Sequence, residues 1–143
     1  MAKYWLGVVH RAHALRGKED GFARTNHGRR FGVARMSPGD GFVYYSPKES
    51  YPDGPILRAF TAIGIVDDGD EWQEDEGEFQ PWQRAVTYDR EAREAPIRPI
   101  IEALELTRGK QNWGLQLQKG HLEISQHDFA IIADEMGSHI LAE

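Results

Sequence analysis

Short runs of β-forming residues, separated by glycine- and proline-rich turns, constrain the fold of this chain more than any other feature. Strands are expected over residues 4–10, 41–46, 56–68 and 82–89. These runs do not alternate regularly with helices, so the pattern lacks the βαβ units of a parallel sheet. We therefore expect an α+β fold in which five to six strands form a strongly curved sheet or small barrel, with short helices packed around it.

Helical signals are few and lie near the two ends of the chain. Residues 11–17 are expected to form a helical turn that Gly17 stops, and residues 18–30 a loop. Residues 29–36 could hold one more helical turn. Isoleucines at helical spacing predict that a helix starts at 97–106, and 110–125 has no clear period. Ser125 is expected to cap a last helix with an apolar stripe of Phe129, Ile132, Ala133 and Met136.

The strand at 41–46 carries aromatic residues on alternating positions. Since successive side chains of a strand point to opposite faces, one face should hold Phe42, Tyr44 and Ser46 and the other Val43 and Tyr45. The following strand, 56–68, could bend at Gly64. It reads as a long strand.

Length and composition narrow the class of protein. With 143 residues the chain fits one domain, 1–143, that can bury its own core. No apolar run is long enough to cross a bilayer, and the first residues lack a basic leader with a cleavage site, so we expect a cytoplasmic protein without a membrane partner. The chain has no cysteine, which rules out disulfides and thiol catalysis. A monomer is expected.

Charge is distributed unevenly along the chain. The net charge is −6, yet residues 1–50 hold nine Lys/Arg against four Asp/Glu, while 51–143 hold eight against nineteen. Eight of the acids fall within 67–78, a pattern typical of a solvated hairpin loop. Binding a long duplex requires a broad basic face, which this chain is not expected to offer.

The usual catalytic motifs are missing from the sequence. There is no Gly-x-Ser-x-Gly elbow and no glycine-rich phosphate loop. His10 and His13 lie three residues apart, but a pair without a third ligand is weak support for a metal site. We expect a protein that is not an enzyme, with no catalytic residues, no cofactor and no metal.

A basic, polar loop carries side chains that are suited to ligand binding. Asn26 can donate to and accept from a base edge, His27 can stack, and Gly28 allows close backbone approach. Tyr45, Ser46 and Pro47 end the aromatic strand and could line the same pocket. Flanking phosphates would then meet four cations: Arg24, Arg29, Arg30 and Lys48. The simpler alternative is that Asn-His-Gly only makes a tight turn and that the tyrosines are core residues.

Several strings occur in an order that resembles the EVE domain, a family of the PUA-like superfamily related in fold to YTH domains. They are "KYWLGV", "GFARTNHG", "PGD" before "YYSPK", "FTAIGIV", and "KQNWG" followed by "LEIS". The resemblance spans residues 3 to about 136. It implies a small mixed barrel of PUA-like type with a pocket for one nucleobase.

The resemblance also implies which residues form that pocket. It places there Trp5, Phe22, Ala23, Arg24, Thr25, Asn26, His27, Tyr45, Ser46, Trp113 and Gly114. The loop tryptophan that walls the cage of YTH proteins has no counterpart in 22–27, and Phe22 is its candidate replacement. The function implied is a non-catalytic module that recognises a modified base in DNA or RNA. The alternative is a small-molecule or protein-interaction module that uses the same pocket.

Overall fold

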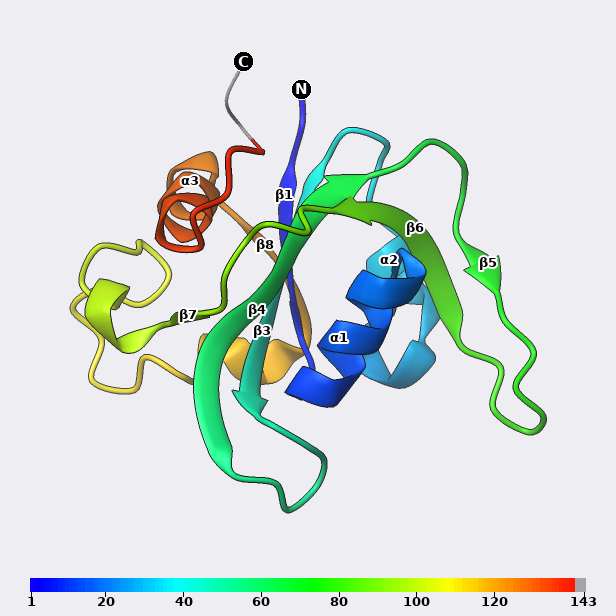
Figure 1. Ribbon diagram of the computed structural model, residues 1–143, viewed down its shortest axis with the longest axis horizontal. Coiled ribbons are helices and arrows are strands. Elements are labelled where there is room, and N and C mark those ends of the chain that lie inside the picture. Colours follow the sequence, from blue (N-terminus) through cyan, green and yellow to red (C-terminus); the bar gives the residue numbers. More distant parts are fainter. Residues whose placement is uncertain (141–143) are drawn as a thin grey trace.

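A curled mixed sheet forms the body of the protein in the computed structural model, which describes residues 1–140. The strands follow the order β2-β6-β4-β3-β1-β8, and the sheet curls into a half-barrel (Figure 1). β1 and β3 are parallel, and the other pairs are antiparallel. The main strands are β1 (Tyr4–Val8), β2 (Phe22–Ala23), β3 (Gly41–Lys48), β4 (Ile56–Val66), β6 (Trp82–Tyr88) and β8 (His121–Ile124). This confirms the predicted α+β class and curved sheet.

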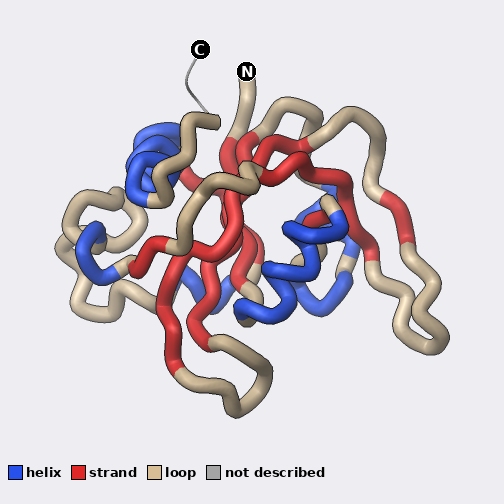
Figure 2. Tube along the Cα trace, in the orientation of Figure 1, coloured by secondary structure: helices blue, strands red, loops and turns tan. Residues whose placement is uncertain are grey.

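Two very short strands and several short helices complete the fold (Figure 2). β5 (Trp72–Gln73) pairs with β6, and β7 (Ala95–Pro96) pairs with β4. The α-helices are α1 (Arg11–Asp20), α2 (Arg30–Ala34) and α3 (Gln126–Glu135). The 3-10 turns are η1 (Asn26–Gly28), η2 (Arg98–Ile100) and η3 (Gln116–Lys119). Within the described residues, no helix has both the length and the apolar content needed to cross a bilayer.

The two faces of β3 belong to two separate apolar clusters, as the alternation predicted. Phe42 and Tyr44 pack with Trp5, Val33 and Met36 on the side that α1 and α2 cover. The opposite face belongs to a larger cluster with α3, in which Val43 and Tyr45 pack with Leu6, Phe60 and Phe129. Ser46 is fully buried, and its hydroxyl is 2.8 Å from that of Thr61.

The first helix runs further than its sequence predicted. Gly17 was expected to stop it, yet α1 continues to Asp20 and ends at Gly21, whose φ is +79°. Gly17 is buried, and a Cβ there would lie 2.7 Å from the carbonyl oxygen of Phe22. The glycine serves close packing instead of helix termination. The segment 18–30 is therefore a helix end, β2 and η1, and not a single loop.

Two further segments differ from the sequence-based expectation. The helix predicted to start at 97–106 is only the 3-10 turn η2 followed by turns. The segment 110–125, expected to be irregular, contains η3 and the edge strand β8, which pairs antiparallel with β1. A strand of four residues gives too short an alternation to be recognised in a polar context.

The last helix matches its prediction closely. Ser125 caps α3, and its Oγ accepts a hydrogen bond of 3.1 Å from the backbone N–H of Asp128. The predicted stripe is buried against the sheet: Phe129, Ile132, Ala133 and Met136. α3 covers one face of the sheet. It does not cover the ends of β1 and β3 that lie at the bottom of Figure 1.

Candidate functional site

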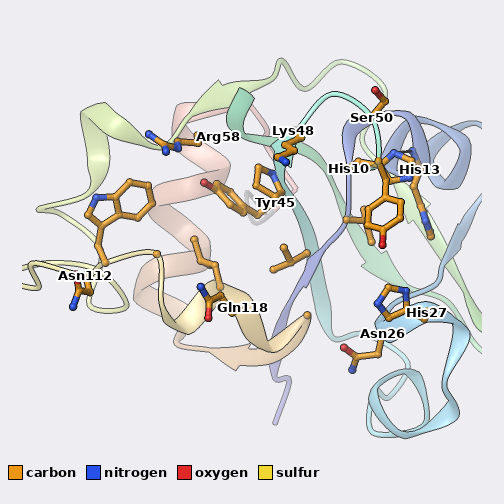
Figure 3. A pocket seen from close by; sticks show the side chains of 18 of the residues that line it. His10, His13, Asn26, His27, Tyr45, Lys48, Ser50, Arg58, Asn112 and Gln118 are labelled. Carbon is orange, nitrogen blue, oxygen red and sulfur yellow. Dashed lines mark hydrogen bonds between the residues drawn. The ribbon is translucent and has the colours of Figure 1, made fainter. Parts of the chain in front are cut away.

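A large cavity of about 850 Å³ lies at the end of β1 and β3, between α1, η1, the β3–β4 hairpin and the segment leading into β8 (Figure 3). Five stretches that are distant in sequence bring side chains to it. The residues that line it are Val8, Val9, His10, His13, Asn26, His27, Tyr45, Pro47, Lys48, Ser50, Tyr51, Arg58, Arg98, Gln111, Asn112, Trp113, Gly114, Leu117, Gln118 and Gly120.

The cavity lining is positive in an otherwise acidic chain. None of the Asp and Glu residues in 1–140 is among its 20 lining residues, which include three Lys/Arg and three histidines. Two tyrosines, a tryptophan and several apolar residues supply the rest of the surface. Such a cavity favours a ligand that combines a flat aromatic part with negative charge.

Unusual backbone conformations gather at the cavity. Within residues 1–140, the non-glycine residues with positive φ are Asn26 (51°), His27 (57°) and Arg58 (56°), and all three line it. Left-handed conformations cost energy for residues with a Cβ and cluster at functional sites. The backbone is thus held in an unfavourable form where it presents these three side chains to the cavity.

Tight packing holds the Asn26–Gly28 turn in place. Gly28 has a φ of +83°, and a Cβ there would lie 2.6 Å from that of Pro81. Just before the turn, the hydroxyl of Thr25 lies 2.9 Å from Nδ1 of the buried His121. The side-chain oxygen of Asn26 lies against Gly120, where any side chain would collide with it. The turn therefore cannot relax without moving β8.

His13 contributes an unsatisfied polar atom to the cavity wall. Its Nε2 is buried without a hydrogen-bond partner, and its backbone N–H donates to Nδ1 of His10 (3.2 Å). Burial lowers the pKa of His13 to about 4, and the positive charge of Arg24 lowers it further. At neutral pH the ring is uncharged.

Tyr45 forms part of the cavity floor and stays neutral. Its ring packs edge-to-face on Phe60 with centroids 5.4 Å apart. Burial raises the pKa of its phenol to about 12, against an opposing effect of the Arg58 charge. The phenol therefore remains protonated throughout the physiological range and can act as a donor or an acceptor.

The structure brings about half of the predicted site residues to the cavity. Those that line it are Asn26, His27, Tyr45, Pro47, Lys48, Trp113 and Gly114. Gly28 supports the turn, and Ser46 is buried behind Tyr45. The Asn-His-Gly turn and Trp113 thus converge on one hollow.

Trp5 does not reach this hollow. Its side chain is fully buried, and Nε1 donates a 2.9 Å hydrogen bond to the Asp40 carboxylate. Its pairing with Phe42 in the β1–β3 register turns it toward the α1 and α2 side of the sheet. Trp5 and Trp113 therefore belong to different parts of the molecule.

The other residues placed in the pocket by the resemblance also lie inside the protein. Phe22, Ala23 and Thr25 are buried, and Phe22 lies under the guanidinium of Arg24 at 5.0 Å from its ring centroid. Phe22 is therefore no replacement wall for this cavity. It instead covers a buried cation on the opposite side of β2.

The loop arginines are mostly engaged with the acidic segment. Arg24 is buried and its Nη2 donates to Gln83 (2.7 Å) and Glu76 (2.8 Å). Arg30 stacks on Trp82 and pairs with Glu71 at 2.8 Å. Arg29 is exposed but does not line the cavity. Of the four predicted phosphate ligands, only Lys48 lies at the cavity, and its Nζ donates to the Pro52 carbonyl (3.1 Å).

Sequence reasoning missed several lining residues. His10 and His13 were weighed as a metal pair against surface or capping roles, and Tyr51, Arg58 and Arg98 were not considered for the site. Arg58 lies within a predicted strand and Arg98 in a predicted helix, so no local pattern marked them. Only the three-dimensional arrangement places both beside Trp113 and Tyr45 in the same lining.

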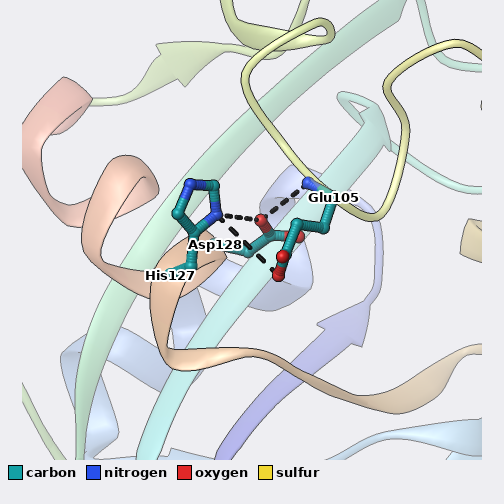
Figure 4. Close-up of side chains that lie close together, drawn as sticks. All are labelled: Glu105, His127 and Asp128. Carbon is teal, nitrogen blue, oxygen red and sulfur yellow. Dashed lines mark hydrogen bonds and ion pairs between the residues drawn. The ribbon is translucent and has the colours of Figure 1, made fainter.

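A second polar cluster lies away from the cavity, where Glu105, His127 and Asp128 place ligand-type atoms within 4.8 Å (Figure 4). The Asp128 carboxylate is buried and already accepts hydrogen bonds from the backbone N–H groups of Glu105 (2.8 Å) and Leu106 (2.9 Å). Ser125 Oγ donates to Glu105 at 2.6 Å. These contacts fasten a loop to the start of α3, and they leave the carboxylate little capacity for an ion.

The curled mixed sheet and the cavity at one end of it define a small PUA-like half-barrel protein. The chain belongs to the EVE domain family, because the model of the EVE domain matches residues 3–135. It is 48% identical over 138 residues to a UPF0310 protein of Renibacterium salmoninarum, covering 96% of this chain and 98% of that one. It is 38% identical over 138 residues to the UPF0310 protein YdcG of Bacillus subtilis, covering 96% and 94%.

Solved structures with the same fold have little sequence identity to this chain. The crystal structure of protein Atu2648 from Agrobacterium tumefaciens has a TM-score of 0.59 at 13% identity, covering 96% of this chain and 94% of that one. The NMR structure of Rpa0253 from Rhodopseudomonas palustris has a TM-score of 0.57 at 13% identity, covering 99% and 96%. At these identities the likeness concerns the fold alone.

Proposed function

We propose that the protein is a non-catalytic nucleic-acid-binding module that holds one nucleobase, preferably a modified one, in the cavity beside Trp113. The observation that carries the proposal is a large cavity whose described lining is aromatic and free of acidic residues, in an acidic chain. Membership of the EVE domain family is consistent with it. A single-stranded or flipped base is the ligand that uses all of these features.

The cavity has the chemistry that base binding needs. A flat base gains about 1 to 3 kcal/mol by stacking on an aromatic side chain, and Trp113, Tyr45 and His27 supply such surfaces. The Asn26 amide offers both a donor and an acceptor for a base edge, held by a strained backbone.

Preference for a modified base would come from small increments. A buried methyl group adds about 0.8 kcal/mol, which corresponds to a preference of several-fold. Val8, Val9, Pro47 and Leu117 give the cavity apolar surface for such a group. Stronger discrimination requires a polar group, such as Asn26, that the wrong base leaves unpaired.

Binding to labelled single-stranded DNA and RNA, each with one methylated or unmodified central base, tests the proposal by fluorescence anisotropy. Trp113→Ala should weaken binding about tenfold or more, the effect of losing one stacking surface. Trp72→Ala is the matched control, because Trp72 lies on β5 and does not line the cavity.

Two results would contradict the proposal. One is that no strand binds more tightly than about 1 mM, which corresponds to only 4.1 kcal/mol. The other is that Trp113→Ala and Trp72→Ala bind alike. Free nucleosides that raise the melting temperature without any strand binding would instead favour a small-molecule module.

A further inference from the structure

Two arginines that the base-binding residues do not use also line the cavity. In Figure 3, Arg58 lies beside Tyr45, whereas His10, His13 and His27 lie on the other side of the cavity. Arg98 is also part of the lining. β7 pairs antiparallel with β4, and the backbone N–H of Ile97, next to Arg98, donates to the Arg58 carbonyl at 3.0 Å. The two arginines are therefore carried by paired segments.

A β-bulge sets the direction of the Arg58 side chain. Between the pairs Ser46↔Ala59 and Lys48↔Ile56, β3 advances by two residues and β4 by three, so β4 holds an extra residue there. Arg58 lies in this bulge with a φ of +56°. Bulges next to sites re-aim side chains, and arginine seldom adopts this conformation without a compensating role. Here the bulged residue is one that lines the cavity.

Neither arginine is neutralised by the protein. Among residues 1–140, no carboxylate lies within ion-pair distance of Arg58 or Arg98, and no acidic residue lines the cavity. Arg24 and Arg30, in contrast, form ion pairs with Glu76 and Glu71. The Arg58 charge also acts on the neighbouring Tyr45 phenol, where it opposes the effect of burial on the pKa.

We propose that Arg58 and Arg98 form a phosphate subsite that holds the phosphodiester next to the bound base. This inference rests on the proposed function and adds a ligand requirement to it. The planar guanidinium matches two oxygens of one phosphate, and two guanidiniums that line one cavity can share a single phosphodiester. At about 850 Å³ the cavity has space for a base with its sugar and one phosphate.

The test uses labelled single strands in which one linkage at a time is an uncharged methylphosphonate. In the natural protein, one linkage beside the central base should weaken binding about tenfold when neutralised, the equivalent of 1.4 kcal/mol. Arg58→Gly should bind the fully charged strand about tenfold more weakly and lose its sensitivity to that linkage. Arg98→Ala should show the same loss.

Arg58→Gly separates binding from folding. Glycine accepts the positive φ of this position without strain, so the variant should unfold at a urea concentration no lower than the natural protein does. Arg90→Gly is the matched control, since Arg90 is an exposed arginine in the turn after β6 that does not line the cavity. It should keep the full linkage sensitivity.

The outcomes distinguish the subsite from the base site. If the natural protein binds strands but no single linkage matters, or if Arg58→Gly keeps the sensitivity, the subsite is overturned while base binding stands. If no strand binds, both fail. A nucleoside monophosphate that binds as tightly as the strand, and loses affinity in Arg58→Gly, would support the phosphate subsite but assign it to free nucleotides.

Discussion

At the residue scale, backbone strain is concentrated where the cavity needs particular side chains. Asn26, His27 and Gly28 adopt positive φ in succession. Asparagine and histidine tolerate this region better than most residues, and glycine adopts it freely. The sequence therefore contained a usable signal at this turn, because an Asn-His-Gly triplet is compatible with such a backbone whereas most triplets are not.

A substitution at His27 should show this strain directly. His27→Val should lower the free energy of unfolding by about 1 to 2 kcal/mol, because a β-branched residue is poorly accommodated at φ = 57°. His27→Asn should leave it within about 0.5 kcal/mol. Urea unfolding measures both. Equal stabilities would show that the turn is not held in the left-handed region, since an exposed valine alone costs little.

The half-buried His13 and the buried His121 predict a loss of stability in mild acid. Burial lowers the pKa of His13 and of His121 to about 4 each, with smaller contributions from Arg24 and Arg35. The unfolded chain binds these protons near pH 6.5, so stability is fully present above that pH and is lost as the pH falls toward 4. Each histidine should contribute a slope of up to about 1.4 kcal/mol per pH unit in this window.

The slope of the unfolding free energy against pH, and not its absolute value, shows which histidines are responsible. Urea midpoints measured from pH 7 to pH 4 should fall less steeply for His121→Asn than for the natural protein, even if the variant is less stable throughout. The exposed His27→Asn variant is the control and should keep the natural slope. An unchanged slope in His121→Asn would mean that His121 is not kept neutral by burial.

At the scale of elements, helix α1 shows how packing overrides local propensity. Propensity favours alanine over glycine inside a helix by about 1 kcal/mol. A Cβ on Gly17, however, would lie 2.7 Å from the backbone oxygen of Phe22 and 3.2 Å from the Tyr44 ring. Gly17→Ala should therefore destabilise the protein by about 1 to 3 kcal/mol in urea unfolding. A gain in stability would show that α1 can move away from β2.

The contact between α3 and the loop at Glu105 and Leu106 depends on the buried carboxylate of Asp128. Asp128 is 2% exposed and accepts hydrogen bonds from the backbone of Glu105 and Leu106. Asp128→Ala should lower the free energy of unfolding by about 2 to 4 kcal/mol, because two backbone donors lose a charged acceptor. Asp134→Ala, at an exposed position of the same helix, should cost less than about 0.5 kcal/mol. Similar losses in both variants would contradict the assigned role.

The elements that could be predicted from the sequence have strong local signals. The alternation at 41–46 and the capped stripe after Ser125 are of this kind, and both are confirmed. β8 could not be predicted, since it is a four-residue edge strand defined by its pairing with β1. The predicted end of α1 was wrong for a related reason. Gly17 packs closely against β2 across the packing interface and does not end the helix.

At the scale of the whole molecule, the cavity is a product of long-range assembly. Asn26, Tyr45 and Trp113 could be proposed from the sequence because each belongs to a conspicuous local string. Trp5 belongs to an equally conspicuous string, yet strand pairing turns it into the opposite core. Arg58 enters the site through a bulge, which no sequence periodicity reveals.

The arrangement of charge over the whole molecule predicts weak dependence of strand binding on salt. Glu76 and Glu71 pair with Arg24 and Arg30, so these two loop arginines are not free to contact phosphates. With one phosphate contacted by Arg58 and Arg98, the logarithm of the binding constant should fall with the logarithm of the salt concentration at a slope of about −0.7. Duplex DNA binds best to a broad basic face, so it should bind this protein more weakly than a single strand does.

Replacing one acid should change this slope in a predictable direction. Glu71→Gln releases Arg30 from its 2.8 Å ion pair and should steepen the slope by about 0.7, the value of one added phosphate contact on a single strand. Glu78→Gln removes the same charge from an exposed position that has no ion pair within the described residues, and it should leave the slope almost unchanged. Anisotropy titrations across a tenfold range of KCl measure both. A slope steeper than about −3 in the natural protein would instead indicate a wide phosphate-binding face, and the acidic hairpin would then have to lie away from the bound strand.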